Sequence, residues 1–312
     1  MKVHLLEPLE ISDEQLDEFE DKLKEAGHSF KAYDEKTTDA NELYERSKDA
    51  DVVIIANNPY PKEVVDKLEK TKFIQVAFTG LDHVALESAE EKSIEVKNAA
   101  GYSDQAVAEL VIGLTLDVYR KITKGNAHIR QGGDSQGFIG QEIKDKTVGI
   151  VGTGNIGLNT ARLFKAFGAK LIATSRSEKE EALELGIEYF DLHDMLSQAD
   201  IVTIHLPLNK HTQGYFDEAA FDAMKKDAIL INAARGPIVD TQALIEALKS
   251  KKIAAAAIDV YDNEPPLDPQ SELFTLDNLI TTPHVAYYTK EAMVRRAEIA
   301  FSNVLDFVHQ NA

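Results

Sequence analysis

The sequence contains no cysteine, fewer basic than acidic side chains and no long apolar run. Without cysteine, the chain can form neither a disulfide nor a thiolate metal site, and it has no thiol nucleophile. Its longest apolar runs, near residues 52–56 and 253–258, are too short to span a membrane. The first residues lead directly to Glu7 and lack the apolar core of a signal peptide, so we expect a cytoplasmic protein without membrane contact.

Acidic residues outnumber basic ones by 53 to 34, which gives a formal net charge of −19. A nucleic-acid-binding protein needs a basic surface, so we expect no nucleic-acid partner. A small anionic substrate would require a local positive site instead. With 312 residues, of which 44% are hydrophobic, the chain is long enough for two domains of ordinary size.

The most informative stretch is residues 145–176, where a short apolar run ends in the hexapeptide Gly-Thr-Gly-Asn-Ile-Gly at 152–157. A helical apolar pattern and a second apolar run follow. This order of strand, glycine turn, helix and strand is the context in which a GxGxxG motif indicates dinucleotide binding. Gly152 permits the tight turn, Gly154 lets a pyrophosphate approach the backbone, and Gly157 allows the helix to pack on the strand. The free N–H groups of the helix N-terminus favour phosphate.

Strands and helices alternate on both sides of this motif, which predicts two doubly wound parallel sheets. The expected strands of the first domain are residues 3–6, 30–33, 52–56, 73–77 and 94–97. Those of the second domain are residues 148–151, 171–174, 187–190, 201–206, 229–232, 256–260 and 279–281. The apolar pattern of residues 103–130 predicts one long helix that either joins the domains or forms a dimer contact. The last helix, residues 290–310, is expected to pack on the first domain.

Three polar side chains follow strands of the second domain: Arg235, Glu264 and His284. Open α/β sheets bind ligands at the carboxyl ends of their strands, so we expect these side chains to converge. The imidazole can protonate a carbonyl oxygen, and a neighbouring carboxylate favours its charged form. The guanidinium can hold a substrate carboxylate with two hydrogen bonds. The set suits redox chemistry on a 2-oxo acid. No third ligand accompanies His193 and Asp194, so we expect no metal.

The motifs together resemble those of the D-isomer-specific 2-hydroxyacid dehydrogenase family, including its glyoxylate/hydroxypyruvate reductase-like and phosphoglycerate dehydrogenase-like members. The resemblance rests on segments 152–157, 232–237 (NAARGP), 259–265 (DVYDNEP) and 283–286 (PHVA), which occur in the family's order. It implies a Rossmann NAD(P)-binding domain, residues 101–284, inserted into a flavodoxin-like catalytic domain formed by residues 1–100 and 285–312. It also implies a small 2-oxo acid as substrate, and we expect a homodimer.

The resemblance also implies roles for individual residues. Arg235 looks like the substrate-binding arginine, Glu264 like the carboxylate paired with the histidine, and His284 like the acid/base. Asp259 resembles the aspartate that contacts the nicotinamide carboxamide. The substrate carboxylate would be held by the backbone of Thr79, Gly80 and Leu81. The expected cofactor-binding residues are Gly152, Gly154, Asn155, Ile156, Gly157, Ser175, Arg176, His205, Pro207, Ala233 and Asp259.

One position departs from the pattern of an NAD site. An acidic residue near the end of the second strand of the nucleotide domain normally holds the ribose 2′-hydroxyl. Here Ser175 stands in that place and Arg176 follows. A missing carboxylate and an added cation would accommodate a 2′-phosphate, so we expect NADP(H) to be favoured over NAD(H). The alternative is that Arg176 stacks on the adenine and treats both cofactors alike.

A second class of function is also compatible with the resemblance. Corepressors of the C-terminal-binding-protein type resemble the same family and use the fold to sense dinucleotide and bind peptides. The presence of Arg235, Glu264 and His284 together favours an enzyme over such a binding protein. The identity of the 2-oxo acid cannot be predicted, because it depends on the shape of the pocket.

Overall fold

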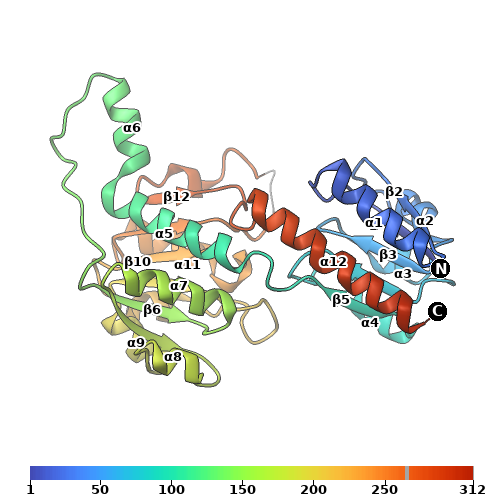
Figure 1. Ribbon diagram of the computed structural model, residues 1–312. Helices are drawn as coiled ribbons and strands as arrows, with labels where there is room; N and C mark the ends of the chain where they lie inside the picture. The colour runs from blue at the N-terminus through green and yellow to red at the C-terminus, as the bar shows by residue number, and fades with distance from the viewer. Residues whose placement is uncertain (264–266, 312) are drawn as a thin grey trace. The chain divides into compact units, whose positions relative to one another are not determined.

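The computed structural model describes residues 1–263 and 267–311, which form two compact units. Unit 1 consists of Met1–Ser103 together with the C-terminal segment from Tyr288, and unit 2 consists of Asp104–Tyr287. In both units, the sheets of the described residues contain only parallel strand pairs. The prediction of two doubly wound α/β domains, one inserted into the other, is therefore confirmed (Figure 1).

Unit 1 contains, among its described residues, a five-stranded sheet in the order β2-β1-β3-β4-β5. This order is the flavodoxin-like one. Its strands are β1 (Lys2–Leu5), β2 (Ser29–Ala32), β3 (Val52–Ile55), β4 (Phe73–Val76) and β5 (Glu95–Asn98). Its helices are α1 (Asp13–Glu25), α2 (Ala40–Ser47), α3 (Lys62–Val65), α4 (Leu86–Glu91) and the C-terminal α12 (Lys290–Gln310).

The C-terminal helix α12 completes the core of unit 1. Thr289 caps its first turn by accepting a hydrogen bond from the Ala292 N–H at 3.2 Å. The ring of Phe301 stacks on Phe19 of α1, with 3.8 Å between centroids. Further along, Phe307 stacks on Phe73 of β4 at 4.6 Å. The prediction that the last helix packs on the first domain is confirmed by these contacts.

Unit 2 contains, among its described residues, a seven-stranded sheet in the order β12-β11-β10-β9-β6-β7-β8. This order contains the strand arrangement of a Rossmann domain. The strands are β6 (Thr147–Val151), β7 (Lys170–Thr174), β8 (Glu188–Tyr189), β9 (Ile201–Ile204), β10 (Ile229–Asn232), β11 (Ala255–Ile258) and β12 (Leu279–Thr281). The helices are α5 (Asp104–Arg120), α6 (Ile122–Arg130), α7 (Asn155–Ala166), α8 (Glu180–Glu184), α9 (Leu192–Gln198), α10 (Glu218–Ala223) and α11 (Thr241–Lys249), with 3-10 turns at Gly236–Ile238 and Glu272–Thr275.

Helices cover both faces of this sheet. Buried side chains of α5 and α7 form one apolar cluster with Ile150, whereas those of α9, α10 and α11 form another with Val151. Neighbouring residues of a strand point to opposite faces, so Ile150 and Val151 belong to different clusters. Burial on both faces explains why the strands of this sheet have nearly continuous apolar sequences.

The prediction of one helix over residues 103–130 is wrong, because two helices meet at Lys121. Lys121 has a left-handed backbone, with φ of 53°. The Asp117 carboxylate accepts hydrogen bonds from the N–H and the hydroxyl of Thr123, at 2.8 and 2.6 Å, and so replaces helical partners at the break. None of the described residues of α6 is buried, and Figure 1 shows this helix extending away from the sheet of unit 2.

Among the described residues, none of the helices combines the length and the apolar character that crossing a membrane would require.

Candidate active site

Three neighbouring strands of unit 2 end in register at the carboxyl-terminal end of the sheet. Asn232 of β10 is paired with Ile258 of β11, and Ile258 is paired with Thr281 of β12. The segments that follow the carboxyl ends of β10, β11 and β12 carry Arg235, Asp259 and His284, respectively. The fold thus brings these three sequence-predicted residues to adjacent strand ends. Glu264, the fourth, lies outside the described residues.

Arg235 lies in a turn that the side chain of Asn232 organises. The Asn232 carboxamide accepts a hydrogen bond from the Ala234 N–H at 3.1 Å and donates one to the Arg235 carbonyl at 3.0 Å. The guanidinium of Arg235 donates to the Ala234 carbonyl at 2.8 Å, and the residue is half-buried. The buried Asn232 therefore fixes the backbone from which Arg235 projects. Sequence reasoning did not reveal this role of Asn232.

His284 lies in a segment with an unusual backbone. Its φ is 55°, in the left-handed region, and its N–H bonds back to the Thr282 carbonyl at 3.0 Å. Non-glycine residues in this region are uncommon and concentrate at functional sites. The half-buried imidazole meets the Tyr287 ring edge-on, with 5.5 Å between centroids. The hydroxyl of Tyr261 also donates to the Thr282 carbonyl, at 2.7 Å.

Asp259 holds the segment around His284 by hydrogen bonds on both sides of this residue in the chain. Its fully buried carboxylate accepts hydrogen bonds from the Thr282 hydroxyl at 2.5 Å and from the N–H groups of Val285 and Ala286 at 3.0 and 2.8 Å. The sequence suggested only a contact with the nicotinamide carboxamide. The structure adds a positioning role, which sequence reasoning missed because the donors are more than twenty residues away along the chain.

The glycine turn between β6 and α7 fits a dinucleotide phosphate. Gly152 has φ of 97°, and a Cβ there would lie 2.8 Å from the His205 carbonyl oxygen. A Cβ on Gly157 would lie 2.1 Å from the Gly152 carbonyl oxygen, so both positions require glycine for packing. A Cβ on Gly154 would meet no atom within 4 Å, so the space above this residue is open. No side chain caps α7, whose first residues, Asn155 and Ile156, come directly after Gly154.

The end of β9 lies beside this turn and carries His205 and Pro207. The Nε2 atom of His205 is 3.0 Å from the hydroxyl of the buried Thr203. Burial lowers the pKa of His205 to about 3, so the ring is neutral near pH 7. Pro207 is exposed, and Ala233, at the end of the next strand, is buried. A neutral histidine presents no charge to a phosphate.

The end of β7 carries Ser175 and Arg176, both exposed. Within the described part of the chain, neither side chain makes a hydrogen bond or an ion pair with another residue. A guanidinium so placed can bind a ligand without first breaking an internal ion pair. The strand order puts this position beside the glycine turn, because β7 is the neighbour of β6.

The predicted carboxylate-binding loop belongs to unit 1 and follows β4. Thr79, Gly80 and Leu81 are half-buried, and the Asn98 side chain donates to the Thr79 carbonyl at 2.8 Å. The Thr79 hydroxyl is buried and has no hydrogen-bond partner among the described residues. A buried hydroxyl without a partner is costly, so this loop has an unused polar group.

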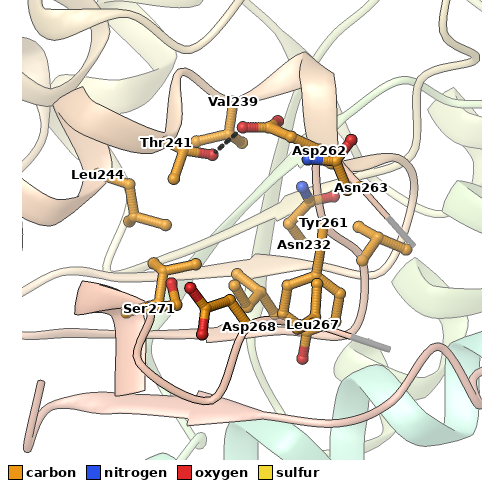
Figure 2. A pocket seen from close by; sticks show the side chains of 14 residues that line it. Asn232, Val239, Thr241, Leu244, Tyr261, Asp262, Asn263, Leu267, Asp268 and Ser271 are labelled. Carbon is orange, nitrogen blue, oxygen red and sulfur yellow. Dashed lines mark hydrogen bonds between the residues drawn. The ribbon is translucent and has the colours of Figure 1, made fainter. Parts of the chain in front are cut away.

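A cavity of about 320 Å³ lies beyond the carboxyl ends of β10 and β11. Figure 2 shows Thr241 and Asp262 on one side, joined by a 2.7 Å hydrogen bond, and Asp268 and Ser271 on the other. Asn232, which holds the turn of Arg235, forms part of the wall. The sequence gave no sign of this cavity. Within the described ranges, no group of three or more histidine or acidic side chains could hold a metal ion.

Comparison with known proteins identifies the architecture. A family model described as D-isomer specific 2-hydroxyacid dehydrogenase, NAD binding domain, matches residues 112–286, which is more than half of the chain. The chain belongs to the D-isomer specific 2-hydroxyacid dehydrogenase family. The family suggested by the sequence motifs is therefore confirmed.

Two relatives illustrate the range of the family. Glyoxylate reductase of Thermococcus litoralis is 37% identical over 284 residues, which cover 88% of this chain and 85% of the relative. D-3-phosphoglycerate dehydrogenase of Methanocaldococcus jannaschii is 41% identical over 255 residues, or 80% of this chain. The matched part is 48% of that relative, so the chain spans about half of the phosphoglycerate dehydrogenase.

Solved structures agree with the fold and differ in cofactor. An acyclic imino acid reductase in complex with NADPH and D-Arg has a TM-score of 0.89 and 27% identity, with 99% of this chain and 98% of that chain covered. D-lactate dehydrogenase from Aquifex aeolicus, complexed with NAD and lactic acid, has a TM-score of 0.86 and 28% identity over 99% and 96% of the two chains. Similar folds thus accompany either dinucleotide.

Proposed function

We propose that this protein transfers a hydride between NADP(H) and a small 2-oxo acid, producing or consuming a D-2-hydroxy acid. The observation that carries the proposal is the register of β10, β11 and β12, which puts Arg235, Asp259 and His284 at adjacent strand ends. Family membership supports dehydrogenase chemistry over the corepressor-type binding protein. The nicotinamide ring supplies or accepts the hydride when it is bound.

In this proposal His284 donates a proton to the carbonyl oxygen during reduction and removes it during oxidation. Glu264 pairs with the imidazole, as the family pattern implies. Arg235 binds the substrate carboxylate and polarises the carbonyl, because its planar guanidinium can donate two parallel hydrogen bonds. The family pattern also implies that Thr79, Gly80 and Leu81 supply backbone N–H groups to a substrate carboxylate.

We assign the cofactor to the carboxyl ends of the neighbouring strands β9, β6 and β7. The pyrophosphate would lie at Gly152, Gly154 and Gly157 and meet the uncapped N-terminus of α7 through Asn155 and Ile156. The exposed Ser175 and Arg176 would face the adenosine ribose, where their lack of negative charge favours a 2′-phosphate. His205, Pro207 and Ala233 would line the path toward the nicotinamide, which Asp259 would help to orient.

A spectrophotometric assay at 340 nm tests the proposal. The panel comprises glyoxylate, hydroxypyruvate, pyruvate and bulkier 2-oxo acids, each measured with NADPH and with NADH. We expect oxidation of NADPH with at least one of these acids and a lower kcat/KM with NADH. Absence of turnover across the panel, with dinucleotide binding intact, would instead support the corepressor-type function.

We also propose that the protein is a homodimer that uses α6. Ile122 and Ile129 of this helix are 56% and 63% exposed, and Ile139 beyond it is 90% exposed. Exposed apolar side chains seven residues apart lie on one face of a helix, and such a face is typical of an interface. Light scattering coupled to size exclusion should give a dimer for the wild type and a monomer for Ile129→Glu. Leu183→Glu, at an exposed position of α8, is the matched control and should remain dimeric.

A further inference from the structure

The loop that carries Ser175 and Arg176 is anchored at both ends to the glycine turn. At its start, the Gly152 N–H donates to the Thr174 carbonyl at 2.9 Å. At its end, the Lys179 N–H donates to the Tyr189 hydroxyl at 3.3 Å. That hydroxyl in turn donates to the hydroxyl of Thr153 at 2.9 Å.

Tyr189 reaches Thr153 across the end of β7. Tyr189 belongs to β8 and is paired with Ala173 of β7, whereas Thr153 follows β6 on the far side of β7. Thr153 is 1% exposed and Tyr189 is half-buried, so water competes little for this bond. The three hydrogen bonds close a ring through the glycine turn, the loop and the edge strand.

Between the anchors, residues 175–178 are all exposed. Their conformation therefore depends on the two ends of the loop. At the second end, the Lys179 carbonyl accepts hydrogen bonds from the first turn of α8, and the bond from the Lys179 N–H to Tyr189 ties this end to the glycine turn. We propose that Tyr189 is a positioning residue for the adenosine ribose, and that it sets the preference between NADPH and NADH by holding the loop at a fixed distance from the glycine turn.

This inference rests on the proposed function, in which Ser175 and Arg176 face the ribose. Ribose recognition requires the loop and the phosphate-binding turn to keep their separation, because both contact the same ligand. Removing the Tyr189 hydroxyl releases the loop without altering a group that touches the cofactor. The loss should therefore fall on discrimination between the two cofactors rather than on binding of both.

Titration of nicotinamide fluorescence gives the Kd for NADPH and NADH and tests the inference. Tyr189→Phe should reduce the ratio of the two constants by about fivefold, the scale of one net hydrogen bond. Thr153→Val breaks only the bond between Tyr189 and Thr153, so it should change the ratio in the same direction and by no more than Tyr189→Phe, which also breaks the bond from Lys179. The double variant should have no larger effect than Tyr189→Phe, because that change already removes both bonds. Thr153→Ser, which keeps a hydroxyl, should restore the wild-type ratio. Tyr215→Phe, at another half-buried tyrosine of unit 2, is the matched control.

Hydrogen exchange provides a second readout. The amides of residues 175–179 should exchange faster in Tyr189→Phe and Thr153→Val than in Thr153→Ser. An unchanged cofactor ratio in Tyr189→Phe and Thr153→Val, or an equal loss for both cofactors, would overturn the inference while leaving the proposed function intact. A wild type that binds neither dinucleotide would overturn the proposed function and the inference together.

Discussion

The Asp259 carboxylate accepts a hydrogen bond from the Val285 N–H at 3.0 Å, immediately beyond His284. The bond fixes the residue that follows the proposed acid/base, and the Thr282 hydroxyl fixes a residue before it. His284 has a left-handed backbone between these two attachments. The ring is thus held by a buried carboxylate that need not touch it.

Replacing Asp259 with asparagine should loosen this attachment. The new amide would place a donor against at least one of the N–H groups that now meet a carboxylate oxygen. A buried donor left unpaired costs about 1–3 kcal/mol, so we expect lower stability and a marked fall in kcat. Urea denaturation and steady-state kinetics measure both effects. Asp262→Asn, on the same loop, is the control, and an equal effect of the two changes would contradict the positioning role.

His284→Gln should lose most of kcat while cofactor binding survives. General acid–base groups contribute about 10²–10⁴-fold to rate, and glutamine cannot exchange a proton near neutral pH. The kcat from the 340 nm assay and the Kd for NADPH from fluorescence should therefore respond differently. A variant with near-normal kcat would remove His284 from the mechanism.

Arg235→Lys keeps the charge but loses the planar pair of donors. We expect KM for the 2-oxo acid to rise between about tenfold and a hundredfold, as loss of a charge-assisted hydrogen bond implies, with a smaller fall in kcat. KM for the cofactor should stay constant, which serves as the internal control. Unchanged kinetics for the acid would place Arg235 outside the site.

Ser175→Asp and Arg176→Ala should both shift the preference from NADPH toward NADH. The first places a negative charge where a 2′-phosphate would bind, and the second removes a cation. Because Arg176 is exposed, we expect only about a fivefold effect from its loss, and this effect should shrink at high salt. The ratio of kcat/KM for the two cofactors is the measurement. An Arg176→Ala variant that lowers both values equally would indicate stacking on adenine.

His205 should make the folded state less stable in mild acid. Burial lowers its pKa to about 3 from an ordinary 6.5, so below pH 6.5 the unfolded chain binds a proton that the folded chain does not. The free energy of unfolding therefore falls from pH 6.5 toward pH 3, with a limiting slope of about 1.4 kcal/mol per pH unit. His205→Asn should flatten the difference between urea midpoints at pH 7.5 and pH 5. His193→Asn, at an exposed histidine, should not.

The sequence predicted the fold well because its signals are local or repeated. Alternating apolar strands and helices define the two sheets, and Gly152 and Gly157 occur where packing tolerates no side chain. The break at Lys121 was missed because the apolar pattern continues across it. The left-handed backbone of Lys121 and the side-chain contact from Asp117 to Thr123 reveal that one helix ends and another begins.

The site was predictable to the level of strand ends but not of hydrogen bonds. Arg235 and His284 follow β10 and β12, the two strands that flank β11, and the carboxyl ends of parallel strands lie on the same side of a sheet. That these residues form a site stays a prediction. Tyr189 and Thr153 could not be connected, since 36 positions separate them in the sequence and neither belongs to a motif that joins them. The neutral state of His205 likewise depends on burial, which no short pattern encodes.

The stacking of Phe301 on Phe19 has a consequence for the order in which the protein is made. The residues of unit 2 are contiguous, so this unit can fold as soon as its segment leaves the ribosome. Unit 1 is divided: the rings that stack on Phe19 and Phe73 belong to α12, which is made after all of unit 2 has been synthesised. Until then, the apolar face of the unit 1 sheet that α12 covers remains exposed. Because unit 2 is inserted into unit 1, unit 1 begins to be translated before unit 2 but is completed after it.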